Sequence, residues 1–431
     1  MSEGNKSAKT KMAGKQWLAV FACSMAYVAL ANLQYLARDY YVIYQEANGL
    51  TSVQMGMIMS AVGLCAVIAS FYNGFITDLF RPKTLLMISC SICVAFGGVI
   101  LTNPGYIISM VAFCVFAILP FWTPMAKLLA GITESNEQSS KIFAWLDFFI
   151  AGAGLLAGFI ASAAVASAGS AFGVKIITIV YMVMSALCVI CIPFVDKSKK
   201  EDAKKEKGDK EQGFNFKNVM ILFRDPNQWL TWLAIGLGYT AYIGMTYISP
   251  LLASEFGVSP SIITVLDTIK NSGIGLIAPL IAGMLATRRG AVRSYFCWLG
   301  LYIASMVLII VLPWKPAFAA VAILSVILLS LSAKGRSAIS NTVLMDVKTP
   351  MFLFGTSVGI ESLIMRIPDI FMFTLAGNMI DTYGSKGYYI VFAGCLGFAL
   401  AGLLCNIILT RRLKAGKDSE WFFANAQKAG K

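Results

Sequence analysis

Charged residues interrupt the long apolar stretches of this sequence, and the spacing of some of them could carry a proton or bind an anion. An ionisable side chain within an apolar span costs about 2.5–3.5 kcal/mol on insertion scales, so each needs a partner or a function. Two pairs stand three residues apart, Asp267 with Lys270 and Arg366 with Asp369. On a helix, this spacing brings the two side chains together. Either pair could form a relay, in which an anion captures the cation and releases the carboxylate, or could merely neutralise its own charges.

Arg38 lies on a polar helical face, because Gln34 and Tyr35 precede it by four and three residues. Its guanidinium group offers a planar fork of donors that matches a carboxylate or a phosphate. We therefore expect Arg38 to contact an anionic substrate. The alternative is a structural ion pair, either with an acidic residue of another helix or with the adjacent Asp39.

The candidate site residues form two groups. We expect an anionic substrate to meet Gln34, Tyr35, Arg38, Tyr242, Lys270 and Arg366. We expect proton coupling through Asp39, Asp267, Glu361 or Asp369. Pro368 lies between Arg366 and Asp369 and predicts a kink that would free backbone carbonyl groups beside the site.

The composition indicates a membrane protein. Hydrophobic residues make up 58% of the chain and charged residues 13%, whereas soluble domains average about 45–50% and about 25%. Apolar runs of about 20 residues recur along the whole length and predict membrane-spanning helices. The sequence contains no histidine, which excludes a histidine proton relay, a histidine metal site and a serine–histidine catalytic pair. We expect no enzyme activity and no cofactor, and we expect the ten cysteines to be reduced.

The apolar runs predict an all-α membrane protein with twelve spans. Their expected bounds are 17–44, 50–79, 84–102, 105–129, 139–167, 173–194, 228–253, 260–286, 291–313, 316–342, 352–380 and 387–411. The expected division is an N-terminal tail (1–16), a six-helix bundle (17–194), a linker (195–227), a second six-helix bundle (228–411) and a C-terminal tail (412–431). The linker alternates Lys with Asp and Glu and should be solvated, because it cannot bury apolar surface.

Basic residues in the short loops predict the orientation of the chain. One side holds the N-terminal tail, Arg81, Lys83, Lys141, the linker, Arg288, Arg289, Arg293, Lys348 and the C-terminal tail, and the opposite loops hold Lys175, Lys315 and Lys386. Both termini are therefore expected in the cytoplasm, with the protein embedded in the lipid of the inner (cytoplasmic) membrane. Because the net charge of +13 gathers in loops of one side, it does not indicate a nucleic-acid partner.

A basic, glycine-containing hairpin occurs twice in the chain. The first copy runs from Gly74 to Lys83, and the second runs from Gly283 to Arg293, with the two glycines 209 positions apart. Each copy follows one apolar run and precedes another. A repeat at half the chain length, carried on apolar helices, indicates a duplicated membrane transporter. The alternative is that these basic loops only set the topology.

The repeated hairpin and the six-plus-six arrangement resemble the major facilitator superfamily over essentially the whole chain. Gly74, Asp78 and Lys83 match its Gly-x-x-x-Asp-(Arg/Lys)-x-Gly-(Arg/Lys)-(Arg/Lys) signature. The resemblance implies two pseudo-symmetric bundles that alternate access to a central site. It also implies a cytoplasmic gate in which Asp78 bonds the start of span eleven, near Phe352. The residues expected to serve this gate are Gly74, Asp78, Lys127, Arg288 and Arg336.

A narrower resemblance appears in span one. Residues 35–41, Tyr-Leu-Ala-Arg-Asp-Tyr-Tyr, are similar to the Tyr-Leu-Val-Arg-Lys-Asn-Phe stretch of the bacterial organophosphate/phosphate antiporters. The resemblance implies that Arg38 binds an anionic group of the substrate. The span-seven arginine of those antiporters is replaced here by Tyr242, and their span-two lysine by Ser70. Only Arg38 therefore carries over the implied role.

These features predict a monomeric secondary active transporter for a small organic anion, such as a carboxylate, a sulfonate or a sugar phosphate. Transport would be coupled to proton symport or to exchange for another anion. An alternative is a proton-coupled exporter of drugs or other amphipathic solutes, which would need an unpaired acid (Asp39, Asp147 or Glu361) in an apolar cavity. A second alternative is a transporter-like receptor, which would bind a solute without moving it.

Overall fold

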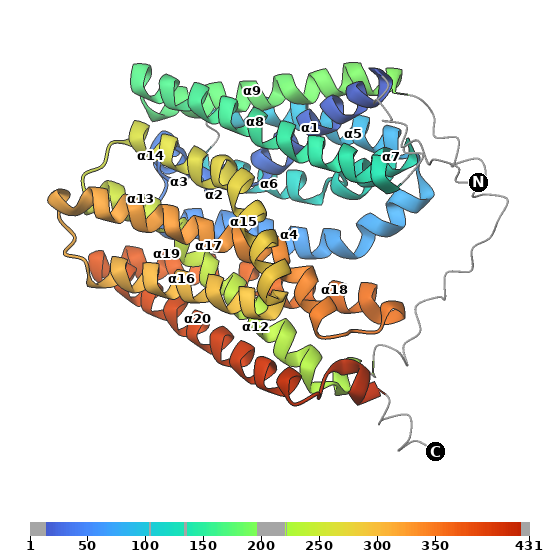
Figure 1. Cartoon of the computed structure of the whole chain (residues 1–431). Coiled ribbons are helices and arrows are strands. Elements are labelled where there is room, and N and C mark those ends of the chain that lie inside the picture. Colours follow the sequence, from blue (N-terminus) through green and yellow to red (C-terminus); the bar gives the residue numbers. More distant parts are fainter. Residues whose placement is uncertain (1–13, 103–104, 133–135, 196–219, 221, 424–431) are drawn as a thin grey trace, which may run out of the picture.

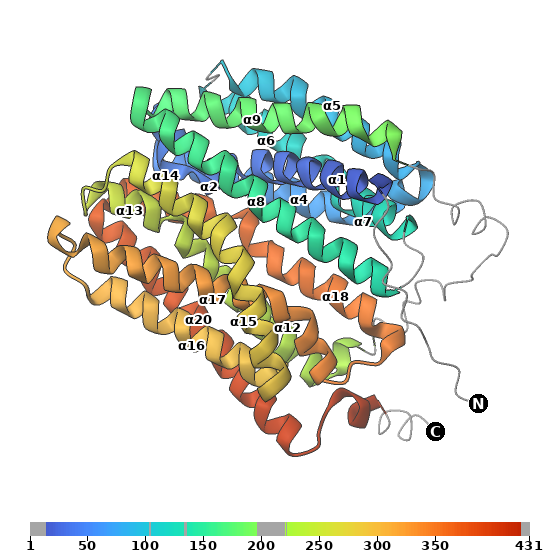
Figure 2. The ribbon, with the colours of Figure 1, turned by 45° about the horizontal axis from the view of Figure 1, so that its top comes forward.

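The computed structural model of this chain describes residues 14–102, 105–132, 136–195, 220 and 222–423. Within these residues every regular element is helical, and the helices form two bundles, one above the other in Figures 1 and 2. This arrangement confirms the predicted all-α fold with two six-helix halves. Most of the predicted linker, 195–227, and parts of both predicted tails lie outside the described residues.

The N-terminal bundle contains six spans, two of which are broken. Its described helices are α1 (Gly14–Gln34), α2 (Leu36–Asp39), α3 (Tyr41–Asn48), α4 (Ser52–Leu79), α5 (Pro82–Ile100), α6 (Gly105–Ile118), α7 (Trp122–Gly131), α8 (Asn136–Ala168) and α9 (Ser170–Cys191), followed by a 3-10 turn, η1 (Ile192–Phe194). Span one consists of α1, α2 and α3. Span four consists of α6 and α7.

The C-terminal bundle repeats this plan with three broken spans. Its described helices are α12 (Pro226–Thr246), α13 (Ile248–Ser254), α14 (Pro260–Thr268), α15 (Ile274–Arg289), α16 (Ala291–Val311), α17 (Ala319–Asp346), α18 (Met351–Arg366), α19 (Met372–Tyr383) and α20 (Ser385–Lys414). The connecting turns are η2 (Ile269–Gly273), η3 (Pro316–Phe318) and η4 (Ile367–Ile370). Span seven is α12 with α13, span eight is α14 with η2 and α15, and span eleven is α18 with η4 and α19.

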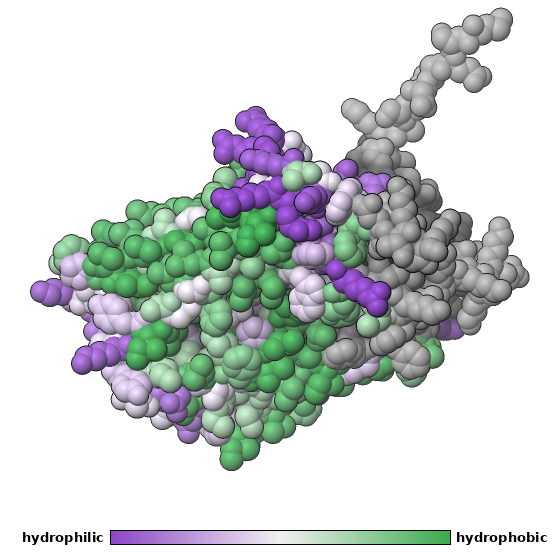
Figure 3. Space-filling model, turned by 90° about the horizontal axis from the view of Figure 1, so that it is seen from below, coloured by the Kyte–Doolittle hydropathy of each residue, from purple (hydrophilic) through white to green (hydrophobic). Residues whose placement is uncertain are grey.

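Eleven helical stretches of the described residues are long and apolar enough to cross a membrane. The stretch formed by α12 and α13, which packs along α20, supplies the twelfth span. Figure 3 shows hydrophobic side chains over most of one face, with hydrophilic ones at its left end and along its upper edge. Such an apolar surface matches the apolar interior of a bilayer.

The ends of the helices define two sides of the molecule. We call tail side the end at which α1 begins and at which α4 and α20 end; it lies to the right in Figure 1. The far side is the opposite end, where the chain turns from α3 into α4. Gly49 makes this turn with φ of 59°, a left-handed conformation that favours glycine. Thr51 then starts α4 through a capping box with Gln54.

On the far side, glycines let the two bundles touch. Gly56 of α4 packs directly on the Phe373 carbonyl group of α19, and Gly377 of α19 packs on the Ser52 carbonyl group of α4. A β-carbon at either glycine would collide with that backbone. Small residues of this kind allow close approach of membrane helices. The far-side halves of α4 and α19 are therefore held together by backbone-to-backbone contact.

Several spans that the sequence predicts as continuous are interrupted near the middle. Span one, predicted as one helix over 17–44, breaks at Tyr35 and Tyr40. Span eight contains a π-helical turn, η2. The 3-10 turn η4 contains Pro368 and agrees with the predicted kink in span eleven. Irregular backbone at membrane depth is tolerated where it is buried in protein or lines a cavity, so these breaks mark the part of the bundles where polar groups can gather.

Replacing Gly335 with Ala should destabilise the protein by about 1–3 kcal/mol, because the new β-carbon would lie 2.7 Å from Cε2 of the Trp298 ring in a packed helix interface. The matched control is Gly300→Ala, since no atom other than those of its chain neighbours and its own helix backbone lies within 4 Å of the position of the new methyl group. Thermal unfolding of the purified variants measures the difference. Equal melting temperatures for the two variants would show that α16 and α17 are not packed as described.

Candidate functional site

A cavity of about 1100 Å³ lies between the two bundles. Its walls come from α1, from the tail-side half of α4, from the junction of α6 and α7, and from α18. The lining residues include Tyr27, Gln34, Tyr35, Ser70, Asn73, Phe121, Trp122, Thr356, Ser362 and Arg366. Because the far-side halves of α4 and α19 are in close contact, the cavity is closed toward the far side and extends toward the tail side.

The floor of the cavity is a small second pocket of about 10 Å³, the space of about one water molecule. Gln34 and Tyr35 line both spaces and so connect them. Arg38, Gly63 and Asp369 line only the floor pocket. A β-carbon at Gly63 would lie 2.7 Å from that of Asp369, so the floor ends where α4 meets η4.

Arg38 pairs with its neighbour Asp39 on this floor. Arg38 Nε lies 3.0 Å from Asp39 Oδ1, and the two side chains are 17% and 14% exposed. Adjacent residues of a regular helix do not face each other, so the pair depends on the breaks that isolate the four-residue α2. The guanidinium carbon also lies 3.9 Å from the centre of the Tyr35 ring. Of the two structural ion pairs that the sequence left open for Arg38, the pair with Asp39 is therefore the one observed, and the expected substrate contact of Arg38 stays a prediction.

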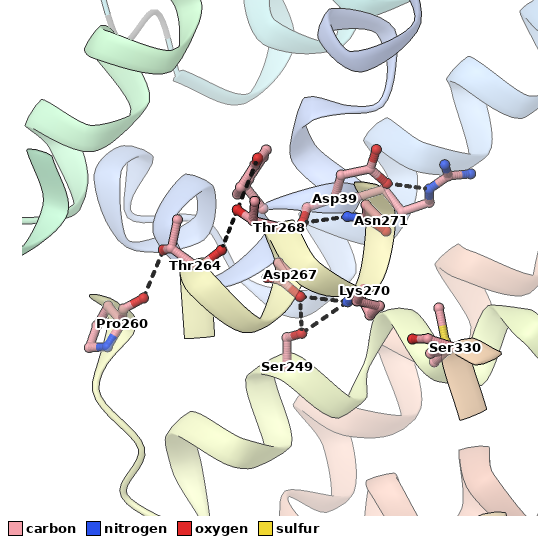
Figure 4. A network of polar contacts seen from close by, with 12 residues as sticks. Asp39, Ser249, Pro260, Thr264, Asp267, Thr268, Lys270, Asn271 and Ser330 are labelled. Atoms are coloured by element: carbon pink, nitrogen blue, oxygen red, sulfur yellow. Dashed lines mark hydrogen bonds and ion pairs between the residues drawn. The ribbon is translucent and has the colours of Figure 1, made fainter. Parts of the chain in front are cut away.

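Asp39 also connects the two bundles. Asn271 Nδ2 donates to the Asp39 carbonyl oxygen at 3.4 Å, across the interface between α2 and η2 (Figure 4). The Tyr40 and Thr268 hydroxyl groups lie 3.5 Å apart at the same interface. The broken part of span one thus meets the broken part of span eight.

Arg366 and Asp369 do not form the predicted pair. Asp369 Oδ2 accepts a hydrogen bond from the Tyr239 hydroxyl of α12 at 2.8 Å, and no ion pair joins Asp369 to Arg366 in the described chain. The prediction is wrong because α18 ends at Arg366 and Asp369 stands in the 3-10 turn η4, so the helix does not continue through the pair. Arg366 instead lines the large cavity beside Tyr35.

Asp267 and Lys270 do form an ion pair, and it is buried. Lys270 Nζ lies 2.5 Å from Asp267 Oδ1, with side chains 4% and 2% exposed. Ser249 of α13 donates to the same oxygen at 2.7 Å and accepts from Lys270 at 3.3 Å (Figure 4). Neither charged residue lines either cavity. In this conformation the two charges neutralise each other, and the expected substrate contact of Lys270 stays a prediction.

Tyr242 and Glu361, two further candidates, also lie outside both cavities. Tyr242 stacks beside Tyr239, with ring centres 6.1 Å apart. Glu361 is 4% exposed, and its Oε2 has no hydrogen-bond partner among the described residues. Burial of an ionised carboxylate without a donor is costly, so Glu361 stays a candidate for carrying a proton.

The position of Arg336 differs from the one that the gate prediction requires. It stands ten residues before the end of α17, about 15 Å along the helix. Its guanidinium group lies inside the C-terminal bundle, 6.0 Å from the Tyr295 ring centre and 5.4 Å from that of Tyr302. The prediction that Arg336 joins a charge network at the end of its helix is therefore wrong. Asp346 occupies that end instead and accepts hydrogen bonds from the Ala291 and Val292 amides at the start of α16.

Two of the other gate candidates lie at the tail side, and the side chains of the remaining two lie outside the described part of the structure. Lys127 Nζ donates to the Thr77 carbonyl oxygen at 2.9 Å, one residue before Asp78. Arg288 is exposed at the end of α15. Gly74 and Asp78 lie in α4, but their surroundings, and with them the predicted bond to the start of span eleven, lie outside the described residues.

An aromatic wall of the cavity was not anticipated from the sequence. Tyr27 of α1 packs edge-on against Phe121 and Trp122 at the junction of α6 and α7, with ring centres 5.9 Å and 5.7 Å away. All three residues line the large cavity. Pro120 at this junction is the sequence signal that could have placed a break, and hence a cavity wall, in span four. Aromatic residues are so common in membrane spans that their types alone gave no signal.

Two helix bundles around a central cavity, with broken helices supplying its polar groups, are the architecture of a secondary transporter. The family model described as Major Facilitator Superfamily matches residues 16–367. The chain belongs to this superfamily, as the sequence predicts.

Relatives and solved structures agree with this assignment. The chain is 22% identical to the inner membrane protein YqcE of Escherichia coli (strain K12), over 87% of this chain and 90% of the relative. It is 24% identical to the inner membrane protein YihN of the same organism, over 94% and 97%. The nucleoside transporter NupG has a similar fold, with a TM-score of 0.68, 14% identity and coverage of 93% and 100%. A D-xylose-proton symporter has a TM-score of 0.68, 13% identity and coverage of 91% and 96%.

The buried pair of Asp267 and Lys270 predicts a non-additive pattern of stability. Lys270→Met or Asp267→Asn alone should destabilise the protein by about 3–5 kcal/mol, because each leaves one charge buried without its partner. The double variant should recover most of this loss. Thermal unfolding of the four proteins in the mutant cycle measures the coupling, and additive losses would contradict the pairing.

Proposed function

We propose that this transporter moves a small organic anion and that Arg366 is its main anion-binding residue. The observation that carries the proposal is the position of Arg366, which lines the central cavity and forms no ion pair with a described carboxylate. A guanidinium group facing a water-accessible cavity is a ready partner for a carboxylate, sulfonate or phosphate. Arg38 lies on the cavity floor beside Asp39 and Tyr35, and its positive charge also favours an anionic substrate.

The charges around the site favour coupling to a proton. Arg38 and Arg366 carry two positive charges, and Asp39 and Asp369 carry two negative ones, so the site is neutral when both acids are ionised. Protonation of Asp369 would leave one net positive charge and strengthen anion binding. Asp369 is 5% exposed, and its Oδ1 has no hydrogen-bond partner in the described chain, so a proton has an acceptor there. By linkage, the anion and the proton would then bind together, which favours symport.

The aromatic wall favours a substrate with a ring or another apolar part beside its anionic group. Tyr27, Phe121 and Trp122 present ring surface to the cavity, and such surface stacks on sugar or aromatic rings. Polar groups of Gln34, Asn73 and Ser362 line the same space. An amphipathic anion fits this lining better than a small inorganic ion does.

The cavity orientation supports an inward-facing state. The tail side carries the basic loops, and this distribution of Lys and Arg favours a cytoplasmic location for it. The cavity reaches toward this side and is closed on the far side. A bacterial homologue of the lysosomal transporter Spinster, described as inward-facing and unoccupied, has a TM-score of 0.61 to this chain, with 13% identity and coverage of 93% and 96%. The protein would lie in the inner membrane with both termini in the cytoplasm, and it would act as a monomer.

A binding series with matched neutral partners tests the anion preference. The purified protein is heated with glucose 6-phosphate or glucose, with benzoate or benzyl alcohol, and with phenylmethanesulfonate or benzyl methyl sulfone. At 100 times its dissociation constant, a bound ligand stabilises the protein by about 2.7 kcal/mol. We expect stabilisation by at least one anion and none by its neutral partner, and we expect Arg366→Gln to abolish it.

The control variant is Arg293→Gln, because Arg293 is exposed at the tail side, lines neither cavity and is not among the residues expected to serve the gate. It should leave the stabilisation unchanged. Stabilisation by amphipathic cations that is insensitive to Arg366 would instead support the exporter alternative, with exposed Asp147 or buried Glu361 as its acid.

A further inference from the structure

One carboxylate joins the two bundles on the far side. Asp381, near the end of α19, accepts a hydrogen bond from the Ser52 amide through Oδ1 at 3.0 Å and another from the Val53 amide through Oδ2 at 2.7 Å. Ser52 and Val53 are the first two residues of α4. A residue of the C-terminal bundle therefore binds the N-terminus of a helix in the N-terminal bundle.

This contact completes the capping of α4. The first four amides of a helix have no partner within it. In α4, the Gln54 amide donates to the Thr51 hydroxyl at 3.2 Å and the Thr51 amide donates to the Gln54 side chain at 3.0 Å. Asp381 accepts hydrogen bonds from the two remaining amides, those of Ser52 and Val53. The negative charge also lies at the positive end of the helix dipole.

The contact between the far-side half of α4 and α19, which we call the far-side strip, is closely packed. Gly377 of α19, one helical turn before Asp381, rests on the Ser52 carbonyl group, and Gly56 of α4 rests on that of Phe373. Farther in, the Thr374 hydroxyl lies 2.9 Å from that of Ser60. These contacts run from the far side to the cavity floor, so solute can enter from the far side only after this strip has opened.

We propose that Asp381 is the far-side gate residue, whose bonds to α4 hold the cavity closed on that side. Opening toward the far side must break both bonds and leave two helix-end amides without their acceptor. Asp381 is exposed, so water replaces the lost partners at moderate cost, as a reversible gate requires. The arrangement is reciprocal to the tail-side gate expected from the sequence, in which Asp78 at the end of span two would bind the start of span eleven. Asp381 ends span eleven and binds the start of span two.

The chain contains a matched control for this role. Asp346 accepts hydrogen bonds from the first two amides of α16 with a single oxygen, Oδ2. Both α16 and the helix that ends with Asp346, α17, belong to the C-terminal bundle. Loss of either carboxylate removes a helix cap, but only Asp381 spans the interface between bundles that must open.

Hydrogen exchange measured by mass spectrometry on the full chain in lipid nanodiscs, without added ligand, tests the proposal. In Asp381→Asn, amides of residues 52–63 and 372–381 should exchange about 5- to 30-fold faster, the factor that corresponds to the loss of one helix-end interaction. Residues 66–73 and 356–366, which border the tail-side cavity, should exchange more slowly as the population shifts to the far-side-open state. Asp346→Asn should accelerate exchange only near residues 291–295, and Asp381→Glu should restore part of the protection.

A second variant keeps the test decisive if Asp381→Asn folds poorly. Gly377→Ala leaves Asp381 in place but sets a methyl group against the Ser52 carbonyl group, so it should produce the same opposed changes on the two sides. Acceleration confined to residues 51–55, with no slowing at 66–73 and 356–366 in either variant, would overturn the proposal and leave Asp381 as a local helix cap. This result would not affect the anion-binding role of Arg366, which the ligand series tests separately.

Discussion

Charge placed among apolar helices must be paired, hydrogen-bonded or in contact with water, because its transfer out of water is costly. The interior of this protein is arranged around that constraint. Asp267 and Lys270 neutralise each other in the dry interface between α13 and α14. Arg38 and Asp39 do so on the floor of the cavity. Among the charged residues of the described chain that line the cavities, Arg366 is left facing the larger space without a carboxylate partner, and this makes it the natural place for a solute to supply the missing charge.

The broken helices and the close-packed helices have complementary roles in this arrangement. Breaks in spans one, eight and eleven place side chains where a regular helix could not, as in the pairing of adjacent Arg38 and Asp39. The unbroken far-side strip of α4 and α19 does the opposite, since Gly56 and Gly377 bring the backbones of the two helices into contact. The broken spans therefore supply the polar groups of the site, and the contact between α4 and α19 closes the far side. A transporter needs both, because its site must meet a solute and then be cut off from one side of the membrane.

The sequence predicted the class and the course of the spans, and it left the site geometry incomplete. The apolar runs predicted the bounds of the spans to within a few residues, because the bilayer fixes both the length and the polarity of a membrane-spanning helix. The i,i+3 rule worked for Asp267 and Lys270, although the π-helical turn η2 begins between them. It failed for Arg366 and Asp369, where α18 ends and Pro368 and the turn η4 intervene. The breaks at Tyr35 and Tyr40 could not be predicted, since neither Gly nor Pro marks them. Arg336 was expected at the gate because it stands 209 residues after Lys127, near the end of its predicted span. It lies instead inside the C-terminal bundle, where it is buried near Tyr295 and Tyr302.

The central claim is that one site takes up an anion and presents it to either side of the membrane. The most direct test is counterflow in proteoliposomes, which are loaded with an excess of the anion that stabilises the protein most and then given a trace of its radiolabelled form outside. Alternating access of one site should produce a transient accumulation of label above its equilibrium level, because outward movement of the unlabelled anion returns the site to bind labelled molecules. Binding of the anion by the purified protein without any such accumulation would contradict the account and indicate a receptor.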